Sequence, residues 1–169
     1  MTLDELNRAS GHQQADFFHT QCAAQRWVER MTQSAPFTSK EALLTAARTH
    51  WATMTESDWS EAFDGHPMIG NLETLRAKYQ SSRGHSSQEQ SGVDGASDQT
   101  LRALADENQA YLDRHGFIFI VFASGKSADQ MLDQLRARIN NSTGQELKLA
   151  AAQQLKITLL RLETQLTED

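Results

Sequence analysis

Four short motifs, each with a hydroxyl residue three positions before an acid, constrain the fold of this chain most. A hydroxyl followed at that distance by a carboxylate can satisfy free amide groups at the start of a helix. The chain carries four such pairs: Thr2 with Glu5, Thr38 with Glu41, Thr55 with Asp58, and Thr143 with Glu146. Each pair therefore predicts the beginning of a helix.

The apolar residues that follow Thr38 recur at helical spacing. The same spacing marks three later segments, at about 97–114, 131–139 and about 144–164. Gly116 follows the first of them and suits the left-handed residue just past a helix end. The stripe of the last segment is mostly apolar, and its polar members include Gln154 and Arg161.

Composition supports the helical interpretation. Only 2 prolines and 9 glycines leave little room for a turn-rich all-β fold, and 38% hydrophobic residues are ordinary for a globular protein. A length of 169 residues fits one domain. We expect an all-α protein, a single domain over residues 1–169, built as a bundle of about seven to nine helices.

The continuous apolar run at 117–123 is the one segment that periodicity does not assign. It has the length of a strand, but no second convincing strand is present to pair with it, and an unpaired strand leaves backbone groups unsatisfied. We expect a buried, irregular segment, either extended or briefly helical, inside the all-α domain.

Charge and cysteine content exclude several classes of protein. The formal net charge of -6 gives no basic stripe for nucleic acid, so no nucleic-acid partner is expected. No apolar run approaches the roughly 20 residues that span a bilayer, and the first residues show no export pattern, so we expect no membrane association and a cytoplasmic location. The single cysteine, Cys22, rules out an intrachain disulfide, and we expect a buried structural thiol.

His66 is the first candidate for chemistry. It lies in Gly65-His66-Pro67-Met68-Ile69-Gly70, where the proline forces the chain to turn or extend and the glycines permit close approach to a ligand. Histidine is also the side chain whose usual pKa is nearest neutrality, as general acid–base catalysis requires. The alternative is a helix-breaking loop with an exposed histidine.

Two further sites are weaker candidates. In a helix, Ser86, Glu89 and Gln90 share one face and could hold a small polar heterocycle, although Ser86-x-x-Glu89 also fits an ordinary capping box. Arg161, on the stripe of the last helix, needs a carboxylate from either the protein or a substrate. The structural ion pair is the more common case.

Taken together, the motifs are more specific than any one of them. In chain order they are Pro36-Phe37, His66-Pro67-x-Ile69-Gly70, Ser86-x-x-Glu89-Gln90, Asn108-x-x-Tyr111, Gly116-Phe117-Ile118-Phe119, and Lys156-Ile157-x-x-Leu160-Arg161-Leu162. This set resembles the decarboxylases of 2-oxo-4-hydroxy-4-carboxy-5-ureidoimidazoline (OHCU), an intermediate of uric acid degradation. The resemblance covers nearly the whole chain.

The resemblance implies an all-α homodimer that uses no cofactor and converts OHCU to (S)-allantoin with loss of carbon dioxide. It implies that His66 is the general acid and that Glu89 is its catalytic partner. The other residues that it places at the substrate site are Pro67, Ser86, Ser87, Gln88, Gln90, Phe119, Ile120, Val121, Phe122, Ala123 and Arg161.

The sequence leaves two alternative functions. A metal site would use His66 and other histidines, but the six histidines form no His-x-x-x-His or His-Cys spacing. A helical adaptor that binds protein partners is the non-enzymatic alternative, and it predicts no turnover and no dependence on His66.

Overall fold

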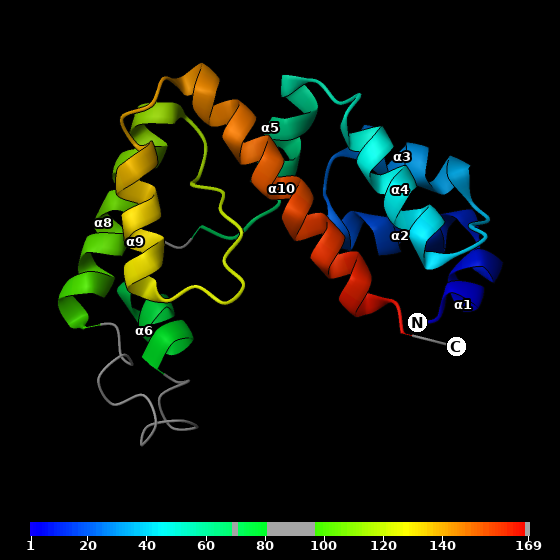
Figure 1. The fold of residues 1–169 in the computed structure, drawn as a ribbon, viewed down its shortest axis with the longest axis horizontal. Helices are drawn as coiled ribbons and strands as arrows, with labels where there is room; N and C mark the ends of the chain where they lie inside the picture. Colours follow the sequence, from blue (N-terminus) through cyan, green and yellow to red (C-terminus); the bar gives the residue numbers. More distant parts are fainter. Residues whose placement is uncertain (69–70, 81–96, 168–169) are drawn as a thin grey trace. The chain divides into compact units, whose positions relative to one another are not determined.

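The computed structural model describes residues 1–68, 71–80 and 97–167, and within these ranges all regular secondary structure is helical apart from one isolated bridge between Thr2 and Thr167 (Figure 1). The expectation of an all-α protein is confirmed. Ser86, Ser87, Gln88, Glu89 and Gln90 lie outside the described residues. The helices are α1 (Leu3–Arg8), α2 (Gly11–Gln21), α3 (Gln25–Ser34), α4 (Lys40–Trp51), α5 (Glu56–Asp64), α6 (Leu72–Gln80), α8 (Asp98–His115), α9 (Ala128–Arg138) and α10 (Thr143–Gln165).

Two of the four predicted helix starts are confirmed. The Glu5 N–H donates to the Thr2 hydroxyl at 3.2 Å, and the Thr2 N–H donates to the Glu5 carboxylate at 2.8 Å. At α5, the Asp58 carboxylate accepts the Thr55 N–H at 2.8 Å. These bonds satisfy amide groups that a helix start leaves without partners.

The other two predicted starts are wrong by one residue. Ser39, not Thr38, caps α4, and Ser142, not Thr143, caps α10. In each case a neighbouring serine offers the same hydroxyl one position away. At α10 there is a second reason, because the side chain of Glu146 is fully buried and therefore does not serve a surface cap.

The chain forms two compact units. The first unit comprises Met1–His66 with Leu147–Asp169, and the second comprises Pro67–Glu146. The division falls within α10, whose first turn belongs to the second unit. The expectation of a single domain over the whole chain stays a prediction.

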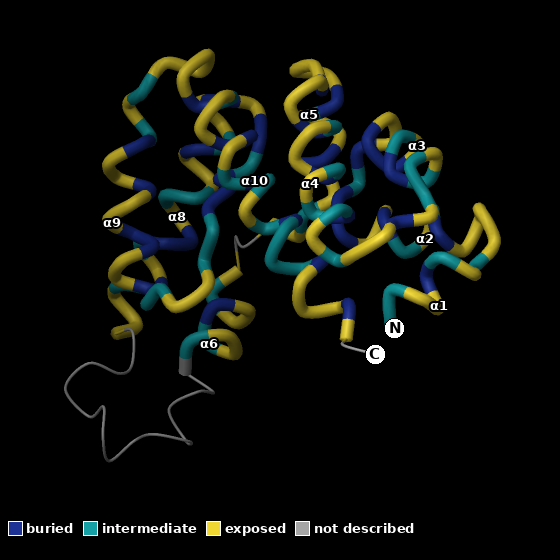
Figure 2. The backbone as a smooth tube through the Cα atoms, turned by 45° about the vertical axis from the view of Figure 1, so that its right-hand side comes forward, coloured by how far each residue is buried: buried dark blue, intermediate teal, exposed yellow. Residues whose placement is uncertain are grey.

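The core of the first unit is built around aromatic side chains. The rings of Trp27 and Phe37 each meet the ring of Phe18 edge to face, with centroids 6.0 and 6.1 Å apart. The indole N–H of Trp27 donates to the Ala47 carbonyl at 3.2 Å, so α3 is joined to α4. Buried and exposed stretches alternate along the helices, each of which has one buried face (Figure 2).

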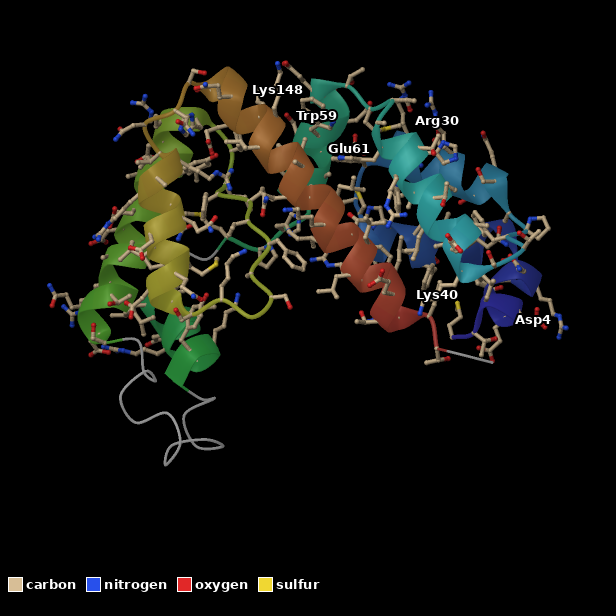
Figure 3. All side chains as sticks on the ribbon, viewed as in Figure 1. Asp4, Arg30, Lys40, Trp59, Glu61 and Lys148 are labelled. Atoms are coloured by element: carbon tan, nitrogen blue, oxygen red, sulfur yellow. The ribbon has the colours of Figure 1, made fainter. Side chains whose placement is uncertain are left out.

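Two contacts fix α10 within the first unit. The indole N–H of Trp51 donates to the Ala151 carbonyl at 3.0 Å, which joins α4 to the middle of α10. The Lys40 ammonium donates to the carbonyls of Glu163 and Leu166 at 2.9 and 3.0 Å, beside the last turn of α10 (Figure 3). A cation at this end pairs with free carbonyl groups and with the negative end of the helix dipole.

The second unit contains α6, α8, α9 and the segment 117–123. Ser97 caps α8, and the helix ends at Gly116, whose φ of 80° is the left-handed conformation expected from the sequence. The segment that follows belongs to no helix or strand, so the expectation of an irregular segment is confirmed. Phe117, Phe119, Ile120 and Val121 are buried in it.

Candidate active site

The end of α5 positions His66. The His66 N–H donates to the Phe63 carbonyl at 3.1 Å, which continues the last turn of the helix. Gly65 precedes it, and a Cβ atom at that position would lie only 2.7 Å from the Cβ of Ala23. Glycine is therefore needed here because the backbone passes so close to the segment after α2.

The His66 ring is half-buried and bonded, so the alternative of an exposed loop histidine is not what the structure contains. Its Nε2 lies 2.5 Å from Oε1 of Gln154, on α10. The Gln154 amide nitrogen donates to the Thr158 hydroxyl oxygen at 3.1 Å, and that hydroxyl donates to the Gln154 backbone carbonyl at 3.0 Å. Gln154 and Thr158 are one turn apart and only 1% and 2% exposed.

Burial is the main reason that the pKa of His66 lies below its usual value, because removal from water disfavours the charged ring. The hydrogen bond with Gln154 acts in the opposite direction, and the positive charge of Arg161 lowers the pKa further. A neutral imidazole is thus the resting form at pH 7.

Arg161 lies on the same helix, and its Nη1 donates to the backbone carbonyl of Gln21 at 3.1 Å. Among the described residues no carboxylate forms a salt bridge with Arg161. The structural ion pair that the sequence left open is therefore not found in the described part of the chain. We call His66, Gln154, Thr158 and Arg161 the His66 cluster.

Cys22 lies next to this cluster and is 2% exposed, which confirms the expected burial. Burial raises the pKa of its thiol to about 11, although a hydrogen bond with Thr158 and the charge of Arg161 act in the opposite direction. The thiol is protonated at neutral pH, so Cys22 lacks the thiolate that a nucleophile needs.

In the second unit, Arg138 holds the irregular segment 117–123. Its Nη1 donates to the Ile120 carbonyl at 2.8 Å, and its guanidinium lies 4.7 Å from the centre of the Phe119 ring. Farther along, the Lys126 ammonium donates to the Phe122 carbonyl at 2.5 Å. These bonds explain how a backbone outside any helix is stabilised in a buried position.

Glu146 is the centre of this polar network. Its Oε1 accepts the Tyr111 hydroxyl at 2.6 Å and Nε of Arg138 at 2.9 Å, and its Oε2 accepts the Asn141 amide at 3.0 Å. Nη2 of Arg138 also lies 2.9 Å from Oε1, but it is not aligned for a hydrogen bond. Burial first, and then the Glu146 carboxylate, raise the pKa of Tyr111 well above its usual range.

The structure thus places the predicted site residues in three groups. His66 and Arg161 belong to the first unit, Pro67 and Phe119 to Ala123 belong to the second, and Ser86 to Gln90 lie outside the described residues. Sequence patterns do not predict that Gln154 is bonded to His66, although Gln154 is a polar member of an apolar stripe. Thr158 is not among the predicted site residues, and its spacing of four residues from Gln154 is the one local signal for it.

Residues 1–68, 71–80 and 97–167 contain neither a metal-binding cluster nor a membrane-spanning helix. No three His, Cys, Asp or Glu side chains come together in a way that could hold a metal ion. No helix in these ranges is both long and apolar enough to cross a membrane.

Comparison with known protein families identifies the family of this chain. A family profile described as OHCU decarboxylase matches residues 7–163. The chain belongs to the OHCU decarboxylase family. The expectation drawn from the His-Pro and Glu-Gln motifs is thereby confirmed at the level of the family.

Similarity to individual proteins supports the same family assignment. The chain is 36% identical over 141 residues to the uric acid degradation bifunctional protein TTL of Arabidopsis thaliana, a match that covers 83% of this chain and 44% of that protein. It therefore spans less than half the length of that relative. It is 24% identical over 164 residues to the OHCU decarboxylase of Halalkalicoccus jeotgali, covering 96% of this chain and 90% of the other.

Solved structures show the same fold. The structure of an OHCU decarboxylase crystallised in the presence of (S)-allantoin superposes with a TM-score of 0.72 at 34% identity, covering 89% of this chain and 96% of that one. A structure of an (S)-allantoin synthase gives a TM-score of 0.72 at 19% identity and covers 98% of this chain and 54% of that one, which supports the fold alone.

Proposed function

We propose that this protein decarboxylates OHCU to (S)-allantoin in uric acid degradation. The observation that carries the proposal is that His66 is bonded to Gln154 of α10, the helix that also carries Arg161. A half-buried neutral imidazole lies within the electrostatic influence of a guanidinium that has no carboxylate partner among the described residues. A substrate with a carboxylate group and a need for protonation on carbon suits both side chains.

The reaction needs only binding, orientation and one proton. The bond between the ring carbon and the carboxylate breaks, carbon dioxide leaves, and the electron pair passes into the conjugated substrate ring, where a ring nitrogen takes the proton of the hydroxyl on that carbon. The hydroxyl oxygen becomes a carbonyl as the neighbouring ring carbon is protonated. His66 delivers one proton to the ring carbon that becomes the stereocentre and recovers a proton from solvent. The face that His66 reaches sets the handedness of the product. Because the substrate ring is itself the electron sink, we propose that no cofactor is required.

Arg161 would couple the departure of the carboxylate to the release of the proton. Its charge lowers the pKa of His66, and a bound carboxylate offsets that charge, so His66 takes up a proton more readily once substrate is bound. When carbon dioxide leaves, the charge of Arg161 is exposed to His66 again. The imidazolium then becomes a stronger acid at the step that needs one.

The direct test supplies freshly generated OHCU and follows the chirality of allantoin by circular dichroism. We expect accelerated formation of (S)-allantoin without added metal or cofactor, and a loss of about 10²-fold or more in kcat in His66→Asn. His12→Asn is the matched control, because His12 is exposed on α2. Absence of turnover in the unmodified protein would favour the helical adaptor instead.

Three further expectations from the sequence remain part of this proposal. We propose that Glu89 acts with His66, that the protein forms a homodimer, and that it works in the cytoplasm. Sedimentation of the purified protein at several concentrations tests the dimer, and a mass of one chain at every concentration would contradict it.

A further inference from the structure

We propose that Gln154 is a positioning residue that keeps hydrogen on Nε2 of His66, so that His66 exchanges its catalytic proton through Nδ1. This inference deepens the proposed function and rests on it for the role of His66. The arrangement of hydrogen bonds, however, is a property of the folded protein and can be measured without substrate.

The orientation of the Gln154 amide follows from Thr158. A hydroxyl has one hydrogen, and that of Thr158 points to the Gln154 backbone carbonyl at 3.0 Å. The Thr158 oxygen must therefore accept, and it accepts from the Gln154 amide nitrogen at 3.1 Å. The amide oxygen consequently faces His66 at 2.5 Å and can only accept, so Nε2 of the ring is the donor.

Burial makes this arrangement persistent. Gln154 is 1% exposed and Thr158 is 2% exposed, so water does not compete for the bonds between these two residues. In the observed orientation the amide oxygen is paired with the His66 ring and the amide NH2 group with the Thr158 hydroxyl, so both buried ends of the side chain have a partner. Unsatisfied buried polar groups are costly, which favours an orientation in which both ends are paired.

A neutral amide suits a histidine that must both gain and lose a proton. In the neutral ring, Nε2–H is bonded to Gln154 and Nδ1 carries the lone pair. In the imidazolium, the same Nε2–H bond is kept and Nδ1 carries the exchangeable proton. The ring therefore need not rotate between the two states, and its reactive nitrogen stays in one direction. Within the described part of the chain, the positive charge of Arg161 lowers the pKa of the ring.

The first test is a nitrogen NMR spectrum of the unmodified protein with labelled histidines, recorded above the pKa of His66. The two ring nitrogens have different shifts depending on which one carries hydrogen. Signals of His66, assigned by their loss in His66→Asn, should show hydrogen on Nε2. Hydrogen on Nδ1 would overturn the inference. This result does not depend on activity.

The second test compares Gln154→Met with Gln14→Met. Gln14 is also buried in the first unit, but its amide donates to the Leu6 carbonyl and lies outside the His66 cluster. We expect Gln154→Met to lower kcat by about 10–100-fold with little change in KM, a part of the full acid–base contribution. Gln14→Met should keep kcat while losing stability. The helical circular dichroism spectrum checks that both variants fold.

Gln154→Glu provides a variant that restores an acceptor. A carboxylate beside His66 favours the charged ring, so the inflection of kcat/KM that belongs to His66 should move to higher pH, with more activity retained than in Gln154→Met. Full activity in Gln154→Met together with inactive His66→Asn would overturn the positioning role alone. If both variants are fully active, the proposed function fails as well, whatever the tautomer.

Discussion

The guanidinium of Arg138 and the carboxylate of Glu146 lie 2.9 Å apart in the second unit, with side chains 10% and 0% exposed. The same carboxylate accepts the hydroxyl of Tyr111, and the same guanidinium reaches the Ile120 carbonyl. This ion pair therefore joins α8, α9 and the start of α10 to the irregular segment 117–123.

Removing one partner of this ion pair should destabilise the fold strongly. Arg138→Met leaves the Glu146 carboxylate buried without its cation, and breaking such a pair costs about 3–5 kcal/mol. Urea unfolding followed by circular dichroism measures the change. The matched control is Arg136→Met on the same helix, because Arg136 pairs with Glu107 at the surface and little change is expected. Equal effects of the two substitutions would contradict this account.

Arg161→Leu should impair capture of the substrate more than the fold. Loss of a charge-assisted bond to a carboxylate predicts a fall of kcat/KM by about 10²-fold, mostly through KM. Removing the cation also removes one cause that lowers the pKa of His66. The inflection that His66 gives in the pH profile of kcat/KM should therefore move to higher pH. Lys156→Met is the control, since Lys156 is exposed on the same helix. A large drop in melting temperature with unchanged KM would show that Arg161 is structural.

The lowered pKa of His66 also predicts how stability depends on pH. As pH falls below the usual histidine value of about 6.5, the unfolded chain binds a proton before folded His66 does. The contribution of neutral His66 to the free energy of unfolding is thus fully present above about pH 6.5 and is lost as pH falls through the pKa of folded His66. Urea unfolding at pH 7.5 and 5.5 should show a smaller loss in His66→Asn than in the unmodified protein. His50, whose pKa is also lowered by burial and by Arg30, accounts for part of the remaining loss.

Much of the fold could be predicted from the sequence because its signals are local. Helical spacing and the glycine after α8 depend on neighbouring residues, and both predictions are confirmed. The observed helix start differs by one residue from the predicted one where a serine stands beside the predicted cap, as at Ser39. The motif does not distinguish between adjacent hydroxyl residues.

The polar networks could not be predicted, because they join residues far apart in the chain. Gln154 and His66 are 88 positions apart, and Tyr111 and Glu146 are 35 apart. Glu146 fits a surface cap by local pattern, whereas the folded chain buries it against three donors. A sequence motif contains only residues that are close together in the chain. It therefore does not predict the partner of a side chain that is bonded to a distant residue.

Glu89→Gln tests the part of the proposed site that lies outside the described residues. The substitution removes a charge at nearly constant shape. If Glu89 is the catalytic partner of His66, turnover should fall by about a hundredfold or more with the melting temperature almost unchanged. If Ser86-x-x-Glu89 is only a capping box, glutamine still reaches the cap amide, and both turnover and melting temperature should stay close to those of the unmodified protein. Steady-state kinetics with a thermal melt decides between them.

Gly65→Ala tests whether the close approach of α5 to the segment after α2 positions His66. The new Cβ would lie 2.7 Å from the Cβ of Ala23 and 3.3 Å from the Ala62 carbonyl oxygen, and neither atom is the end of a flexible side chain. The backbone must shift, at a cost of about 1–3 kcal/mol, and His66 shifts with it. A displacement of about 1 Å in a catalytic group can cost about 10²-fold in rate, so kcat should fall as well.

Two further variants test whether crowding against Ala23 causes the effects of Gly65→Ala. Gly144→Ala adds the same methyl group where nothing lies within 4 Å, and it should stabilise the protein by about 0.4–1 kcal/mol with kcat unchanged. Ala23→Gly removes the atom that clashes, so the double variant Gly65→Ala with Ala23→Gly should recover part of both stability and kcat. The double-mutant cycle then measures a coupling between the two positions, because their effects are not additive when they share one contact. Additive losses would show that crowding against Ala23 is not what places His66.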